Sequence, residues 1–170
     1  MRERIEAGRR CQEAGYHVRY RFSPIVPVRN WREEHREMIE ELFASVKPDV
    51  ITFESIRFMD YAAMVADFGE DLLDPVFLEA MKPTAGVKVQ SGEEVPIEYR
   101  VELYRFIIEE LERVGPETPY AFCREQRSTW DLFEAELSRH GQGPDRYVCN
   151  CGPDSAPGNP LLATTASDQL

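Results

Sequence analysis

The chain has 170 residues, of which 42% are hydrophobic, so it is long enough to form one domain with a real core. Its formal net charge of −11 argues against a surface that holds a nucleic-acid backbone by charge, because such binding relies on clustered Lys and Arg. No apolar run approaches the roughly 18 residues that a membrane span needs, and the charged N-terminal segment lacks the apolar core of a secretory signal. We therefore expect a cytoplasmic protein without membrane contact, in which structural disulfides are not formed.

Helical and strand patterns alternate along the first 141 residues. Asn30 and Glu33 have the spacing of a capping box for the second helix, and Ser128 is expected to cap the last one. In chain order we predict helix 2–14, strand 17–26, helix 31–46, strand 49–56, short helices 60–68 and 75–81, a polar loop or hairpin over 84–95, helix 97–114, strand 118–125 and helix 127–139. The remainder, 142–170, is predicted to be an irregular tail that is largely disordered after 155.

The order of these elements predicts the fold class. Strands that alternate with helices are typical of an α/β protein, in which parallel strands are joined by right-handed helical crossovers. Three strands are too few to close a barrel, so they fit either half of a barrel or a small open sheet.

Each predicted strand has one apolar face and one polar or small face, because neighbouring side chains of a strand point in opposite directions. The apolar set is Val18, Tyr20, Phe22, Ile51, Phe53, Tyr120 and Phe122. The polar set is Arg19, Arg21, Ser23, Glu54, Cys123 and Glu125. One interpretation is that the polar set lines the inside of a barrel and meets a polar ligand near the carboxyl ends of the strands. The other is that Arg19 or Arg21 pairs with Glu54 for structural reasons alone.

Three stretches of the sequence also resemble a known family: "RIEAGRRCQEAGYHVRYRFSPIVPVRNWREEH", "DVITFESIRF" and "ELYRFIIEELERVGPETPYAFCREQRSTWDLF". In this order they resemble the later half of radical S-adenosylmethionine enzymes of the spore photoproduct lyase type, over roughly residues 2–135. The resemblance implies the C-terminal half of a partial (β/α)6 barrel. It also implies DNA-lesion lyase-like chemistry, in which reductive cleavage of S-adenosylmethionine gives a 5′-deoxyadenosyl radical that abstracts hydrogen from the substrate.

The family's CxxxCxxC loop, which holds a [4Fe–4S] cluster, does not occur in this sequence. The resemblance therefore implies that the cluster ligands belong to a missing N-terminal half of the barrel and that this chain alone is inactive. It makes Ser23, Pro24, Ile25 and Glu54 the candidates for contact with S-adenosylmethionine. Of the polar set, Arg19, Arg21, Cys123 and Glu125 would face the substrate. A nucleic-acid substrate is implied by the resemblance but not supported by the charge, so a peptide or a small molecule stays open.

The sequence "CNC" at 149–151 offers a different function. Cys149 and Cys151 could bind a metal ion together with Cys123, with His140 as another candidate ligand. They could equally be a redox-active pair or incidental residues of a loop. The alternative to an enzyme is thus a non-catalytic acidic α/β module that binds a partner or a metal through its tail.

Overall fold

In the computed structural model, which describes residues 1–88, 94–145 and 147–150, three parallel strands form one sheet. The strands are β1 (Arg19–Ile25), β2 (Val50–Ser55) and β3 (Tyr120–Phe122), and they lie in the order β1-β2-β3. Arg19 of β1 is opposite Val50 of β2, and Ile51 of β2 is opposite Tyr120 of β3. The prediction of an α/β fold with parallel strands is therefore confirmed, whereas the partial barrel stays a prediction.

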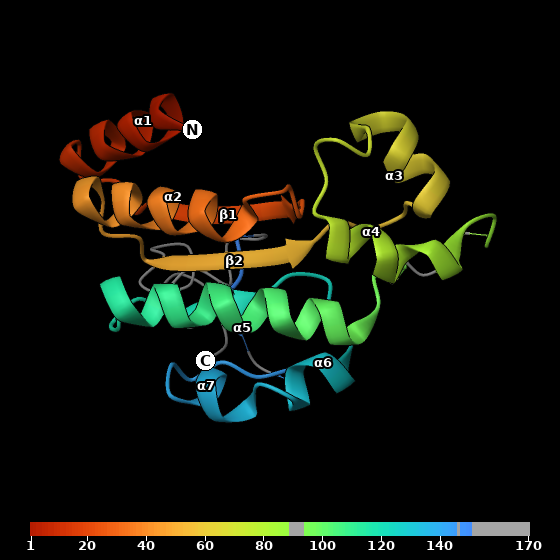
Figure 1. The fold of residues 1–170 in the computed structure, drawn as a ribbon. Helices are drawn as coiled ribbons and strands as arrows, with labels where there is room; N and C mark the ends of the chain where they lie inside the picture. The colour runs from red at the N-terminus through yellow and green to blue at the C-terminus, as the bar shows by residue number, and fades with distance from the viewer. Residues whose placement is uncertain (89–93, 146, 151–170) are drawn as a thin grey trace, which may run out of the picture.

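The helices lie mainly over one face of this sheet (Figure 1). They are α1 (Arg2–Glu13), α2 (Trp31–Ser45), α3 (Tyr61–Phe68), α4 (Pro75–Met81), α5 (Ile97–Val114), α6 (Arg127–Asp131) and α7 (Glu134–Ser138), with a 3-10 turn, η1 (Lys82–Thr84). In Figure 1, α2 and α5 lie on either side of the β2 arrow, α1 lies beside α2, and α3 and α4 lie beyond the tip of that arrow. Among the described residues, none of the helices combines the length and the apolar character that crossing a bilayer requires.

The apolar set of the strands fills the layer between the sheet and the helices, as its alternation predicts. The ring centroid of Tyr104 on α5 lies 5.6 Å from that of Phe53 and 4.8 Å from that of Phe122. On β1, the hydroxyl of Tyr20 reaches α1, where a Cβ on Gly8 would lie only 1.9 Å from it. A fully buried aromatic ring such as that of Phe53 or Phe122 contributes about 1.5–3 kcal/mol.

Residues 56–88 and 94–99 contain a second, smaller core beyond the carboxyl end of β2. Its buried side chains are Ile56, Met64, Leu73, Phe77, Met81, Val95 and Tyr99. Two aspartates cap its helices: Asp60 Oδ1 accepts a hydrogen bond from the Ala63 amide at 2.9 Å, and Asp74 Oδ1 accepts one from the Phe77 amide at 2.9 Å. The core and its caps give this excursion a defined shape next to the strand ends.

Two predicted caps are wrong. Asn30 is the residue before α2, but its side chain makes no capping hydrogen bond. The chain turns there through the backbone instead, because the Trp31 amide donates to the Val28 carbonyl at 3.0 Å. The helix after β3 begins at Arg127, as predicted, but its N-cap is Gln126 and not Ser128, whose hydroxyl bonds the Gln126 side chain at 3.4 Å.

The last helix and the last strand are also shorter than predicted. The helix is broken into α6 and α7 at Phe133, whose φ of −123° leaves the helical region while its fully buried ring packs 5.3 Å from Phe122. The ladder of β3 ends at Phe122, and Arg124 has a φ of 57°, which turns the backbone away from an extended path. Of the predicted loop or hairpin over 84–95, residues 89–93 lie outside the described residues, as does the predicted disorder after 155.

Candidate functional site

Glu54 is the centre of a polar cluster on the sheet. Its Oε1 accepts a hydrogen bond from Arg21 Nη2 at 2.8 Å and another from Ser23 Oγ at 2.5 Å. The parallel register brings them together, because Arg21 lies opposite Thr52, which shares a face with Glu54. The prediction that Arg21, Ser23 and Glu54 lie on one face is therefore confirmed, and Glu54 is held by partners on a neighbouring strand.

Three oxygens at the end of β2 are buried without a hydrogen-bond partner in the described part of the chain. They are Thr52 Oγ1, Glu54 Oε2 and Ser55 Oγ. The side chain of Glu54 is only 7% exposed, so water does not freely replace the missing partner. A buried polar atom left unpaired costs about 1–3 kcal/mol, and native proteins rarely keep one without a reason. A ligand that donates to Glu54 Oε2 would satisfy that atom.

A pocket of about 280 Å³ opens at the carboxyl ends of the strands, and we call it the carboxyl-end pocket. It is lined by Ser23, Pro24, Glu54, Ser55, Ile56, Arg57, Phe58, Met59 and Arg124. The peptide bond between Ser23 and Pro24 in its wall is cis. In βα barrels the active site lies at this end of the strands, so the pocket is where the predicted fold would place one.

Two residues of this pocket have unusual backbone conformations. Phe58 has a φ of 62° and Arg124 a φ of 57°, both in the left-handed region that residues other than glycine rarely adopt. Each costs of order 1–3 kcal/mol, and such residues concentrate at active sites and ligand clamps. The guanidinium carbon of Arg57 lies 5.7 Å from the centroid of the Phe58 ring, and that of Arg124 lies 5.4 Å from it. The sequence analysis missed all three residues.

Glu125 does not lie on the polar face with Glu54, so that placement is wrong. Its fully buried carboxylate accepts hydrogen bonds from Arg100 and Tyr104 of α5, and it lies 3.9 Å from Arg57 Nη1. The expected alternation fails because β3 ends three residues earlier. Burial and the charge of Glu125 raise the pKa of Tyr104, so its hydroxyl stays a donor. The same oxygen accepts a hydrogen bond from the Ser55 amide at 2.8 Å, which ties α5 to the ends of two strands.

The other predicted site residues are spread over a wider area. Ile25 is 1% exposed in the main core and its carbonyl accepts from the Ile56 amide at 3.0 Å, so its side chain does not face the pocket. Arg19 donates instead to the carbonyl of Cys149 at 2.7 Å, which brings the start of the tail to the polar face. Cys123 is buried just beyond β3, where its amide bonds the Phe53 carbonyl at 2.9 Å.

The predicted metal site is not assembled by the residues that the structure describes. Among them there is no group of three or more His, Cys, Asp or Glu side chains that could hold an ion. Cys123 is buried and Cys149 is half-buried, and Cys151 lies outside the described residues. A metal bound by all three cysteines therefore stays a prediction.

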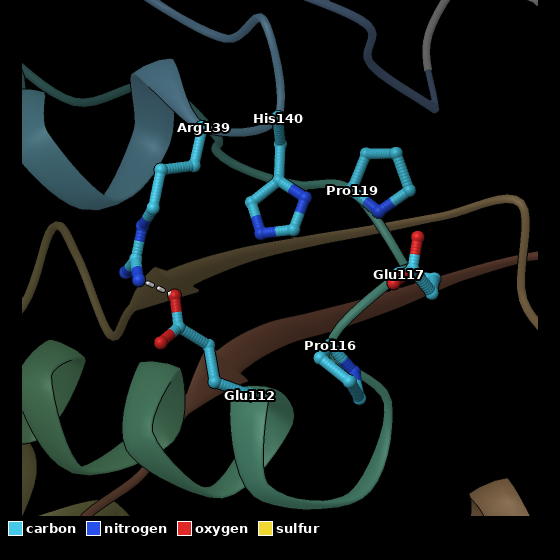
Figure 2. Close-up of a pocket in the computed structure, with 6 residues that line it drawn as sticks. All are labelled: Glu112, Pro116, Glu117, Pro119, Arg139 and His140. Carbon is cyan, nitrogen blue, oxygen red and sulfur yellow. Dashed lines mark hydrogen bonds and ion pairs between the residues drawn. The ribbon is translucent and has the colours of Figure 1, made fainter.

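A larger pocket, of about 500 Å³, lies at the opposite end of the sheet, and we call it the amino-end pocket (Figure 2). It is lined by Glu112, Pro116, Glu117, Pro119, Arg139 and His140. Glu112 is already engaged, since it accepts hydrogen bonds from Arg139 and from the Tyr120 hydroxyl. The His140 ring lies 4.7 Å from that of Tyr120, and burial lowers the pKa of His140.

Comparison of the chain with protein-family models, with curated proteins and with solved structures gave no match in any of the three. The candidate site therefore depends on the geometry of this chain, and the family resemblance of its sequence stays a prediction.

Proposed function

We propose that this chain is the cofactor-cradling and substrate-side half of a radical S-adenosylmethionine enzyme that resembles spore photoproduct lyase. The observation that carries the proposal is the state of Glu54. One of its oxygens is fixed by Arg21 and Ser23, and the other is buried, unpaired and next to the carboxyl-end pocket. A carboxylate oriented in this way is an acceptor prepared for a ligand.

S-adenosylmethionine suits this acceptor. Its amino group and its ribose hydroxyls can donate a hydrogen bond to Glu54 Oε2, which has no donor in the described part of the chain. Its sulfonium carries a positive charge that a carboxylate stabilises. Pro24 and Ile56 supply apolar walls against which the adenosyl moiety would pack. When bound beside a reduced iron–sulfur cluster, S-adenosylmethionine supplies radical chemistry, and the protein's part is to bind and orient it.

The cluster itself does not fit this chain. Its four cysteines, at 11, 123, 149 and 151, lack the spacing of the family's cluster loop. Cys11 is on α1 and Cys123 is buried beyond β3, so these two lie on different elements of the fold. The proposal therefore requires a second half of the barrel that holds the cluster, and no role in cluster binding falls to the residues described here.

The proposal is tested by equilibrium binding of S-adenosylmethionine to the protein that includes both barrel halves. Replacing Glu54 by Gln removes the charge and keeps the shape, and we expect it to weaken binding at least tenfold. Glu112→Gln is the matched control, because it removes a paired carboxylate at the other end of the sheet, and it should leave the affinity unchanged. An unchanged affinity of Glu54→Gln, with an intact circular dichroism spectrum, would contradict the proposal.

A further inference from the structure

The mouth of the carboxyl-end pocket offers an aromatic platform. The Phe58 side chain follows β2 directly and is half exposed, although its backbone adopts the costly left-handed conformation. Pro24, Ile56 and Met59 lie in the same wall, so most of the lining around the ring is apolar. A flat apolar group can stack on such a ring and gain more than the burial of its area alone would give.

Two guanidinium groups lie next to this platform. Those of Arg57 and Arg124 are within 6 Å of the Phe58 ring centroid, on chain segments that follow different strands. Arg57 is held near the pocket by Glu125 at 3.9 Å. Arg124 is exposed, and in the described part of the chain no carboxylate forms an ion pair with it. The fork of a guanidinium matches the two oxygens of a carboxylate or phosphate, so Arg124 is prepared to bind an anionic group.

The surroundings of the mouth disfavour a ligand with many negative charges. Residues 58–88 and 94–99, which follow the carboxyl end of β2, contain eight acidic residues and two lysines. Charges within about 10 Å of each other still interact at 0.1 M ionic strength, so this excursion repels a polyanion that would extend across it.

We propose that this mouth selects a small substrate with a single anionic group, a carboxylate or a phosphate monoester, on a flat apolar body. The flat body stacks on Phe58 and the anionic group binds Arg124, with Arg57 beside it. This inference rests on the proposed function, because it names the substrate class for the site in which Glu54 would hold S-adenosylmethionine.

The test uses the full chain and four probes: 2-naphthoate, 2-naphthyl phosphate, the neutral 2-naphthamide and a ten-nucleotide single-stranded DNA. We expect calorimetry at 0.15 M salt to show at least tenfold tighter binding of the better anionic probe than of 2-naphthamide or the DNA. Which of the two anions binds more tightly identifies the source of the anionic group. Tighter binding of the DNA than of both naphthyl anions would overturn the inference.

Variants show whether the binding takes place at the mouth. Arg124→Gln should weaken the binding of the naphthyl anions about tenfold and leave the affinity for 2-naphthamide unchanged. Arg124→Lys should weaken the binding of the anions less, because lysine keeps the positive charge but lacks the two-pronged guanidinium. Arg105→Gln is the control, since Arg105 lies 5.8 Å from the ring of Phe133 in the same kind of contact, away from the pocket. If the Arg124→Gln variant and the protein without the substitution bind both anions with equal affinity, the inference is overturned.

S-adenosylmethionine, titrated in parallel into the protein that includes both barrel halves, separates this inference from the proposed function. Binding of S-adenosylmethionine without binding of the naphthyl anions contradicts the substrate class alone. Binding of the anions that depends on Arg124, without any binding of S-adenosylmethionine, supports the ligand class and contradicts the proposed function.

Discussion

The two ends of the sheet carry pockets of opposite character. The amino-end pocket is the larger, but its carboxylate Glu112 already bonds Arg139 and Tyr120. The carboxyl-end pocket is smaller, yet its lining includes Glu54, one of whose oxygens is buried and unpaired, and two left-handed residues that are not glycine. Volume alone would select the amino-end pocket. Polar groups left unsatisfied and backbone strain are better indicators, because a folded chain keeps these costs only where the rest of the structure enforces them.

The largest expected effect is on stability, when the glutamates that pair with arginine at the two ends of the sheet, Glu125 and Glu112, are replaced by alanine. Glu125→Ala leaves Arg100, whose side chain is 6% exposed, as a buried charge without its carboxylate. Breaking such a buried pair costs about 3–5 kcal/mol. Glu112→Ala removes a partner of Arg139, which is 56% exposed, and a surface pair of this kind is worth at most about 1 kcal/mol. Urea denaturation of both variants measures the difference, and equal losses would contradict the distinction between the two ends.

The sequence analysis predicted the face that carries the candidate site because that face depends on alternation. Arg21, Ser23 and Glu54 lie in regular strands, where the period of two fixes which side chains meet. The same rule failed at Glu125, because the prediction continued the alternation beyond the end of β3 at Phe122.

The mouth of the pocket was missed for a related reason. Phe58 and Arg124 are brought together by left-handed turns after two strands, and nothing in their residue types indicates a positive φ. The usable signal was position: residues that directly follow the strands of a predicted barrel lie at its active-site end. Arg57 and Phe58 meet that criterion in the sequence "FESIRF". The pairing of Arg57 with Glu125 depends on tertiary packing and had no local signal.

A smaller effect is expected for the two buried tyrosines that donate to these glutamates. Tyr104→Phe removes a hydrogen bond to Glu125 and leaves the buried Ser55 amide without its acceptor, so a loss of about 1–3 kcal/mol is expected. Tyr120→Phe removes the bond to Glu112 without leaving a buried backbone amide unpaired, and about 1 kcal/mol is expected. Thermal unfolding of the two variants ranks them, and a larger loss for Tyr120→Phe would argue that the amino end is the more constrained.

The smallest effect is a pH dependence at the amino-end pocket. Burial lowers the pKa of His140 below its ordinary 6.5, so the folded state binds fewer protons there than the unfolded state. Its contribution to stability is therefore complete above pH 6.5 and is lost as the pH falls through the folded value. His35 on α2 acts in the same direction, since burial also lowers its pKa. His140→Gln should reduce, without abolishing, the loss of stability between pH 7 and 5, and an unchanged slope would contradict this assignment.

The central claim is that the carboxyl-end pocket binds S-adenosylmethionine through Glu54. Hydrogen–deuterium exchange of the protein with both barrel halves tests it most directly, because one experiment reports on both ends of the sheet. The account predicts that S-adenosylmethionine slows exchange in residues 54–59, while exchange in residues 112–118 is unchanged, and that Glu54→Gln removes the protection. Protection at residues 112–118, or protection of residues 54–59 that persists in Glu54→Gln, would contradict it.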